Sequence, residues 1–237
     1  MRIWDVAAGY LSRQSLLGEH RELHGLYSIL VNNKVGYSKH PETRRWVGCE
    51  AALIRRHDLL AAEMRLRGYC DRTPLLRIRG ERLRWPSLFV TGPSDQFALL
   101  DSKYASIRSG RIPLPRNAQD LWAQHKYSVM ARDPQLYREI GRRVAGIRKR
   151  AAFANLTNEL TVILRRAPAP GPLRTAVEHM WGYVSRHAIE ADRSLASRSV
   201  SARLAKTQEI AARIGQPYLL ASTALSELSV YLQRKGI

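Results

Sequence analysis

The sequence is poor in cysteine, with only Cys49 and Cys70 among its 237 residues. The two cysteines form no Cys-x-x-Cys pair and have no histidine at metal-ligand spacing, so neither a zinc site nor an iron–sulfur site is expected. Two reduced thiols are the simpler interpretation. We expect no bound metal and no cofactor.

Long apolar runs are also missing. No stretch approaches the ~20 apolar residues that a membrane helix needs. The beginning of the chain, MRIWDVAAGYLSRQ, has an early arginine and no long apolar segment, unlike a signal peptide. These absences predict a cytoplasmic, nucleoid-associated protein without a membrane partner.

Acidic residues are scarce relative to basic ones. The chain has 39 Lys and Arg against 20 Asp and Glu, which gives a net charge of +19 and a pI of about 10.7. Residues 1–111 carry +8 of this charge and residues 112–237 carry +11. A basic surface attracts phosphates and releases their counterions on binding, and arginine favours bidentate phosphate contacts. Nucleic acid is the expected partner, ahead of membrane, and a solvated basic surface without a specific ligand is the alternative.

The apolar–polar alternation of strands is absent too, and most of the sequence has helical periodicity. Helices are expected over residues 12–32, 46–67, 94–108, 173–188, 199–214 and 217–234. An irregular basic loop is expected over residues 73–93. Asn117 and Asp133 have the sequence context of helix N-caps.

Two prolines in the segment GRIPLPRN cannot lie inside a helix and indicate a linker. We predict an all-α protein with two domains. A compact helical domain covers residues 1–110, a linker covers 111–117, and a helical bundle covers 118–237.

The first expected helix has two distinct faces. At ~100° per residue, four leucines form one stripe, and the opposite side presents Gln14, Arg21 and Glu22 beside Gly18 and Gly25. Each interior glycine costs a helix about 1 kcal/mol relative to alanine. Close approach of a second backbone, such as a DNA strand, is one reason for them, and helix–helix packing over small residues is the other. The spacing alone does not choose between these.

Four segments then resemble a known family. MRIWDV, YLSRQSLLGEHREL (residues 10–23), GYxxHP (residues 36–41) and RGYCDRTPL (residues 67–75) are similar to the pyrimidine-dimer DNA glycosylases of the endonuclease V type. The resemblance covers residues 1 to about 108. It implies the compact helical fold of that family and DNA containing UV-induced pyrimidine dimers as substrate.

The resemblance also implies a chemistry. In the family the N-terminal α-amine attacks C1′ at the damaged nucleotide, a Schiff base forms, and β-elimination cuts the strand with help from a carboxylate. By position the amine belongs to Met1, which the bulky Arg2 should protect from removal, and the carboxylate is Glu22. Gln14, Arg21 and Arg2 match positions that contact DNA or adjoin the amine. An α-amine has a reference pKa of about 7.7–8.0 against about 10.4 for lysine, so more of it is a free nucleophile at neutral pH.

This sequence departs from the family pattern at two places, which concern the choice of DNA lesion and not the amine chemistry. A basic residue four positions after the family's glutamate is replaced by Leu26 or its neighbour Gly25, and the aromatic C-terminus of phage members has no obvious counterpart. Thymine dimers are the default substrate, and ring-opened purines or simple abasic sites remain open. Arg77 and Arg79 of the basic loop are candidate phosphate contacts. A solvated loop is the alternative for them.

The second half resembles another family. Residues 121–145 and 178–187 are similar to the YbgA-like domain, a domain of unknown function numbered 1722, over about 117–237. His125, Lys126, Tyr127 and His179 are a candidate polar cluster there, with a partly buried structural network as the commoner interpretation. The resemblance and the charge suit a DNA-binding or accessory role in a monomeric protein.

Two alternatives to a dimer glycosylase follow from the same residues. One is a non-catalytic DNA-binding protein that kept the fold, and the other is a nucleobase enzyme with its site in the second domain. The presence of Glu22 favours catalysis, because a protein that only binds DNA gains nothing from a carboxylate facing the phosphates.

Overall fold

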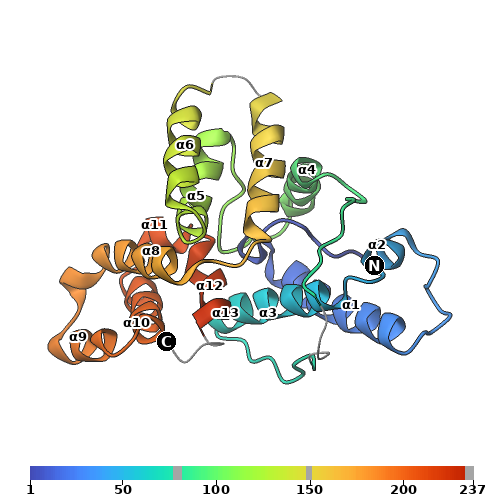
Figure 1. The fold of residues 1–237 in the computed structure, drawn as a ribbon, viewed down its shortest axis with the longest axis horizontal. Helices are drawn as coiled ribbons and strands as arrows, with labels where there is room; N and C mark the ends of the chain where they lie inside the picture. The colour runs from blue at the N-terminus through green and yellow to red at the C-terminus, as the bar shows by residue number, and fades with distance from the viewer. Residues whose placement is uncertain (77–81, 148–150, 233–237) are drawn as a thin grey trace. The chain divides into compact units, whose positions relative to one another are not determined.

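The computed structural model describes residues 1–76, 82–147 and 151–232, and every regular element in these ranges is a helix (Figure 1). The predicted all-α fold class is therefore confirmed. The chain divides into two compact units, residues 1–110 and residues 111–237. No helix in the described ranges is long and apolar enough to cross a membrane.

The first unit is built around two long helices that pack together. Its elements are the 3-10 helix η1 (Ala8–Tyr10) and the helices α1 (Arg13–Val31), α2 (Pro41–Trp46), α3 (Glu50–Leu66) and α4 (Pro93–Tyr104). α1 begins after Ser12, whose side-chain oxygen accepts a hydrogen bond from the backbone N–H of Ser15 at 3.1 Å. α1 packs against α3 and buries Leu16, Leu23 and Leu26 of its leucine stripe.

The helix predicted over residues 46–67 was wrong at its start. Trp46 instead ends α2, and α3 begins only at Glu50. Gly48 has φ of +71°, a left-handed conformation that glycine adopts at little cost and that ends a helix. The third predicted helix ends at Tyr104, four residues early. The described parts of the expected loop, residues 73–76 and 82–92, are irregular, and the candidates Arg77 and Arg79 lie outside the described residues.

The second unit is a set of helices connected by short segments. Its longer helices are α5 (Ala118–Met130), α6 (Pro134–Ala145), α7 (Ala151–Leu164), α8 (Pro170–Gly182), α9 (Glu190–Ser197) and α10 (Val200–Arg213). The predicted caps are confirmed: the side chain of Asn117 accepts from Asp120 N at 2.8 Å, and that of Asp133 accepts from Gln135 N at 2.8 Å. α5 packs against α6, α7 and α8, as expected for a bundle.

Two predicted helices of the second unit are interrupted. The helix expected over residues 173–188 begins earlier, at Pro170, and its second part is the 3-10 helix η2 (Ser185–His187). The helix expected over 217–234 is three one-turn helices, α11 (Pro217–Leu220), α12 (Ala224–Glu227) and α13 (Ser229–Leu232). Ala221, Ser222 and Thr223 separate the first two, and Thr223 donates from its backbone N–H to Gln124 O of α5 at 2.9 Å. This contact with α5 replaces a bond that a continuous helix would have made.

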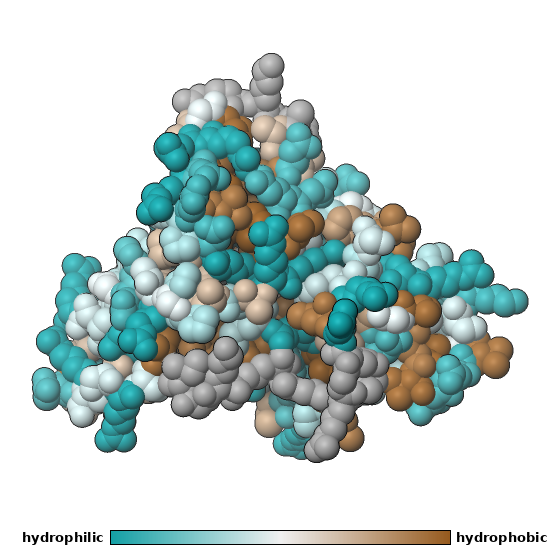
Figure 2. Space-filling view, in the orientation of Figure 1, coloured by the Kyte–Doolittle hydropathy of each residue, from teal (hydrophilic) through white to brown (hydrophobic). Residues whose placement is uncertain are grey.

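The apolar side chains of both units are largely buried. On the face shown in Figure 2, hydrophobic residues lie in separate patches among hydrophilic ones. In the second unit a buried polar group joins two helices: Arg132 forms an ion pair with Glu227, which also accepts a hydrogen bond from the Ser128 hydroxyl at 2.6 Å. The charges are buried together, so each is compensated.

Candidate active site

The first six residues have no helical structure, yet they are held in place by side chains from every α-helix of the first unit. Ile3, Trp4 and Val6 are buried, with at most 7% of their surface exposed. Their backbone polar groups therefore need partners inside the protein. Four side chains provide them and form the N-terminal clamp: Glu19 of α1, Arg45 of α2, Arg56 of α3 and Gln96 of α4.

Two members of the clamp accept hydrogen bonds from the backbone. Trp4 N donates to Glu19 Oε1 at 3.0 Å, and Asp5 N donates to Gln96 Oε1 at 2.8 Å. Gln96 also donates through Nε2 to the Asp5 carboxylate at 2.9 Å. The segment is thus tied to α1 and α4 at adjacent residues.

The two arginines of the clamp donate to backbone carbonyls. Arg45 reaches Ile3 O at 3.0 Å and Arg56 reaches Val6 O at 2.9 Å. Each arginine is buried with a carboxylate: Arg56 pairs with both oxygens of Glu19 at 2.8 Å, and Arg45 pairs with Asp5 at 3.0 Å. Removing one partner of such a pair costs about 3–5 kcal/mol because it leaves an uncompensated buried charge. The start of the chain is consequently a fixed structure.

Burial also changes the ionisation of Glu19. Desolvation raises its pKa above the ordinary value, and the Arg56 charge and hydrogen bonds oppose that shift. The ion pair with Arg56 and the hydrogen bond from Trp4 N fit a carboxylate that serves the clamp.

A cavity of about 550 Å³ opens beside this fixed N-terminus. It is lined by Met1, Arg2, Trp4, Gln14, Ser15, Gly18, Glu19, Glu22, Leu99 and Lys103. The structure therefore brings together five residues singled out in the sequence, namely Met1, Arg2, Gln14, Gly18 and Glu22. Arg21 is exposed on α1 but is not among the lining residues.

Several lining residues were missed in the sequence. Leu99 and Lys103 come from α4, far along the chain from α1, and no spacing rule connects the two helices. Trp4 lies inside the MRIWDV segment, and the Arg2 guanidinium lies 5.1 Å from the centre of its ring. The closeness of Trp4 to Met1 in the sequence was the one feature that could have indicated it as a cavity residue.

The glycines of α1 do not serve helix packing. A Cβ added to Gly18 or to Gly25 would meet nothing within 4 Å. Among the described residues, the alternative of close helix–helix contact over small residues is therefore wrong. Gly18 lies in the cavity wall, where its missing side chain leaves room for a ligand.

The two units match the models of two different protein families. Residues 1–76 match the family model described as pyrimidine dimer DNA glycosylase, and residues 126–227 match that of a protein of unknown function (DUF1722). The chain thus joins a region similar to pyrimidine dimer DNA glycosylases to a region similar to DUF1722, and we name the units that contain them the glycosylase unit and the DUF1722 unit. Both resemblances are thereby confirmed. Neither the curated proteins nor the solved structures gave a match to the chain.

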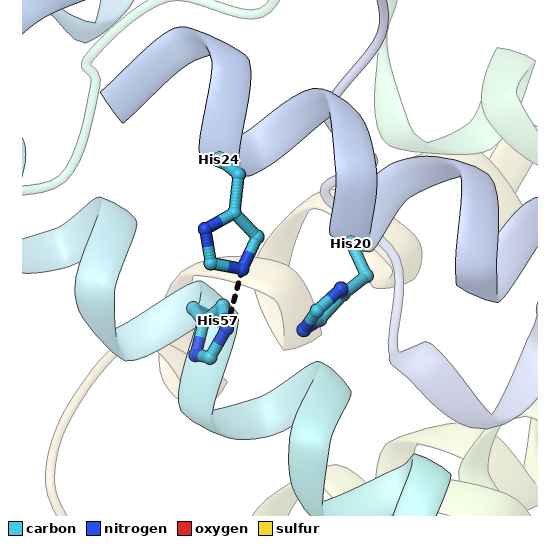
Figure 3. Close-up of side chains that lie close together, drawn as sticks. All are labelled: His20, His24 and His57. Atoms are coloured by element: carbon cyan, nitrogen blue, oxygen red, sulfur yellow. Dashed lines mark hydrogen bonds between the residues drawn. The ribbon is translucent and has the colours of Figure 1, made fainter. Parts of the chain in front are cut away.

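The glycosylase unit contains a second group of side chains, the histidine cluster, made of His20, His24 and His57 (Figure 3). His20 and His24 come from α1 and His57 from α3, and the dashed line in the figure joins His24 Nε2 to His57 Nε2 at 3.2 Å. Asp71 lies beside it, with Oδ1 3.3 Å from His20 Nε2 and Oδ2 3.7 Å from His57 Nε2. Burial lowers the pKa of His57 to about 4 and also lowers that of His24, so both rings are neutral at pH 7.

In the DUF1722 unit the candidate polar cluster is aromatic in character. Lys126 Nζ lies 5.2 Å from the ring centre of Tyr127 and 4.8 Å from that of Tyr218. Tyr127 donates to the Tyr183 hydroxyl at 3.2 Å, and its ring centre lies 6.4 Å from that of His179. Burial raises the pKa of Tyr127, which keeps it protonated.

His125, the fourth candidate of this group, has a ring contact within its own helix. It is buried, and Nδ1 lies 2.8 Å from Leu121 O one turn earlier in α5. Burial lowers its pKa to about 4. A neutral ring that donates to its own helix has the features of a core histidine.

Proposed function

We propose that this chain is a DNA glycosylase and abasic-site lyase that acts on UV-induced pyrimidine dimers, with the Met1 α-amine as nucleophile. One observation carries the proposal: Met1 and Glu22 line the same cavity, and the clamp fixes the segment that begins at Met1. A nucleophile needs a defined position close to its acid or base, because proximity supplies much of the rate enhancement. The family match supports a glycosylase-like activity in this unit.

The chemistry proceeds in balanced steps. The free amine of Met1 attacks C1′ of the damaged nucleotide, and the glycosidic bond breaks with its electron pair leaving on the base. Loss of the proton from nitrogen and opening of the sugar give the Schiff base. Removal of a C2′ proton then breaks the C3′–oxygen bond and cuts the strand, after which water releases the amine. Glu22 is the lining carboxylate that we assign to these proton transfers.

DNA binding follows from the other groups around the cavity. Arg2 and Lys103 are cations suited to phosphate oxygens. Gln14 of α1 offers hydrogen-bond donors and an acceptor, and Arg21 is exposed on α1 as well. The duplex must be distorted to expose the damaged nucleotide, which costs a few kcal/mol and less at a lesion with weakened pairing. The DUF1722 region, with its large share of the net charge, is the accessory DNA-binding part of a monomer in this proposal.

Borohydride trapping is the experiment that tests the amine. Untagged protein is mixed with duplex DNA carrying one thymine dimer, borohydride is added, and the covalent product is mapped by peptide mass. We expect reduction of the Schiff base to leave the DNA attached to the Met1 nitrogen. A protein with one residue added before Met1 is the control, and it should neither cross-link nor turn over.

Other outcomes of the trapping experiment contradict the proposal. A cross-link on a lysine would move the nucleophile elsewhere. No cross-link on either dimer or abasic DNA, with tight binding retained, would favour a protein that binds damaged DNA without catalysis. Cleavage that survives Glu22→Gln but follows His179 would favour an enzyme with its site in the DUF1722 unit.

A further inference from the structure

The histidine cluster lies on the side of α1 away from the catalytic cavity. His20 and His24 are one turn apart, and at ~100° per residue Glu22 lies about 160–200° around the helix from both. Their rings face α3 and meet His57 (Figure 3). The proposed glycosylase reaction has no use for these three side chains.

We propose that His20, His24 and His57 bind one zinc ion, with the Asp71 carboxylate as the fourth ligand. One ring nitrogen from each histidine lies within 4.8 Å of the other two. With zinc–nitrogen distances of about 2.0–2.1 Å, ligand nitrogens of a tetrahedral site lie roughly 3.3 Å apart. The His24 and His57 nitrogens are already 3.2 Å apart, close to this spacing.

The position of Asp71 fits the fourth ligand. Its two oxygens lie 3.3 Å from His20 Nε2 and 3.7 Å from His57 Nε2, so the carboxylate faces the same nitrogens that face one another. As zinc ligands, three imidazoles and one carboxylate would carry a total charge of −1, which offsets half the charge of a divalent cation. Thr73 Oγ1, 3.2 Å from His24 Nε2, offers a second oxygen near the site.

The donor set selects the kind of ion. Calcium and magnesium prefer oxygen ligands, whereas imidazole nitrogen suits zinc and the neighbouring transition metals. Without a metal, the facing nitrogens of His24 and His57 can share only one proton. A metal ion would engage the lone pairs of all three rings at once.

The proposed ion would connect three parts of the glycosylase unit. It would join α1 to α3 and tie both to the segment after α3, from which the basic loop continues. Because it lies behind α1, its role would be structural. Absence of a zinc site would leave the proposed amine chemistry untouched, and absence of the amine chemistry would leave the zinc proposal untouched.

The test uses the full chain purified without a histidine tag. We expect metal analysis to find about one zinc per chain, and calorimetric titration of chelator-treated protein with zinc chloride to show a single tight site that raises Tm. Cobalt(II) in place of zinc should give the intense visible bands of a tetrahedral site. A wild-type protein with no stoichiometric zinc site, or with an octahedral cobalt spectrum, would overturn the proposal.

Variants then assign the ligands. His24→Gln and Asp71→Asn should each weaken zinc binding by more than about 10-fold, since even outer-shell changes have effects of that size. His187→Gln, which alters an exposed histidine of the other unit, is the matched control and should bind like the wild type. Circular dichroism checks that each variant is folded. Zinc binding by folded His24→Gln at wild-type affinity would also overturn the proposal.

Discussion

Two glutamates three residues apart on α1 have opposite environments. Glu19 is 2% exposed and is paired with Arg56, whereas Glu22 is exposed and lines the cavity without a place in the clamp. A carboxylate that is committed to a buried ion pair cannot readily exchange protons with a substrate, and one at a cavity wall can. This difference supports the proposal that Glu22, and not Glu19, takes part in the chemistry.

Glu22→Gln should abolish strand cleavage while binding of damaged DNA persists. The amide keeps the shape of the side chain but cannot accept a proton, so we expect a rate loss of about 10²–10⁴-fold. Single-turnover cleavage and a gel-shift assay on dimer DNA measure the two properties separately. Asp101→Asn, which removes an exposed carboxylate of α4 outside the cavity lining, should cleave normally. Equal activity of the two variants would refute the role given to Glu22.

His125 predicts a pH dependence of stability in the DUF1722 unit. Because burial lowers its pKa to about 4 from an ordinary 6.5, the unfolded state binds a proton that the folded state does not, between these pH values. Stability should be complete above pH 6.5 and fall as the pH approaches 4, by roughly 3 kcal/mol from this residue. Urea unfolding of the wild type and of His125→Gln from pH 7.5 to 4.5 measures it. His187→Gln is the control, and an unchanged slope in His125→Gln would contradict the prediction.

At the scale of elements, three sides of the helix α1 have three different roles. Its leucines pack into the core, one polar side lines the cavity, and its histidines face α3. The cavity side contains Gly18, a weak helix residue with open space where a side chain would be. A glycine that lowers helix stability, packs against nothing and also lines the cavity is expected to serve a ligand.

Gly18→Ala separates folding from DNA recognition. The free protein should gain up to about 1 kcal/mol, because alanine favours the helix and its Cβ meets nothing within 4 Å. Affinity for dimer DNA should fall by roughly 10-fold if a strand approaches this backbone, since overpacking a contact costs about 1–3 kcal/mol. Thermal unfolding and a binding titration measure the two effects. Gly25→Ala should give the stability gain alone, and unchanged DNA affinity in Gly18→Ala would rule out the close approach.

Local signals in the sequence predicted local structure well. Ser12, Asn117 and Asp133 cap their helices as expected, because a cap depends on residues within one turn. The break between α2 and α3 was missed because the apolar pattern continues through Val47 and conceals the left-handed Gly48. The single helix expected near the C-terminus failed for a different reason, since a bond from Thr223 to another helix decides its first interruption.

For the candidate site too, the sequence predicted residues that are close along the chain and not those that only packing brings together. The resemblance located Met1, Arg2, Gln14 and Glu22 because they lie in one short stretch of sequence. Gln96 and Lys103 could not be found that way, since they reach the N-terminus only through the packing of α4. The histidine cluster could not be predicted although His20 and His24 have a helical spacing of four, because the third member, His57, comes from another helix.

At the scale of the whole molecule, the excess of positive charge is shared by both halves of the chain. Neither the glycosylase region nor the DUF1722 region is electrostatically neutral. Phosphate contacts release counterions, so the affinity for DNA should depend steeply on salt. Affinity in one salt concentration alone would say little about recognition of the lesion.

Binding of dimer DNA should weaken by roughly 40-fold between 50 and 200 mM salt if three phosphates are contacted. Lys103→Gln should reduce the slope of log affinity against log salt by about one contact, because its ammonium lines the cavity. Lys39→Gln removes an exposed charge outside the cavity lining and is the comparison. A flat salt response of the wild type would count against the basic surface as the DNA site.

The clamp has a consequence for the order in which the protein is made. Asp5 leaves the ribosome early, but its partner Gln96 is synthesised 91 residues later. Until then the clamp is incomplete, and we expect the enzymes that trim nascent proteins to act on the start of the chain before the clamp has closed. Under the proposed mechanism, the identity of the reactive amine is therefore settled before the site exists. In that proposal the bulk of Arg2 is expected to keep Met1 in place, and the clamp then holds the segment that follows it.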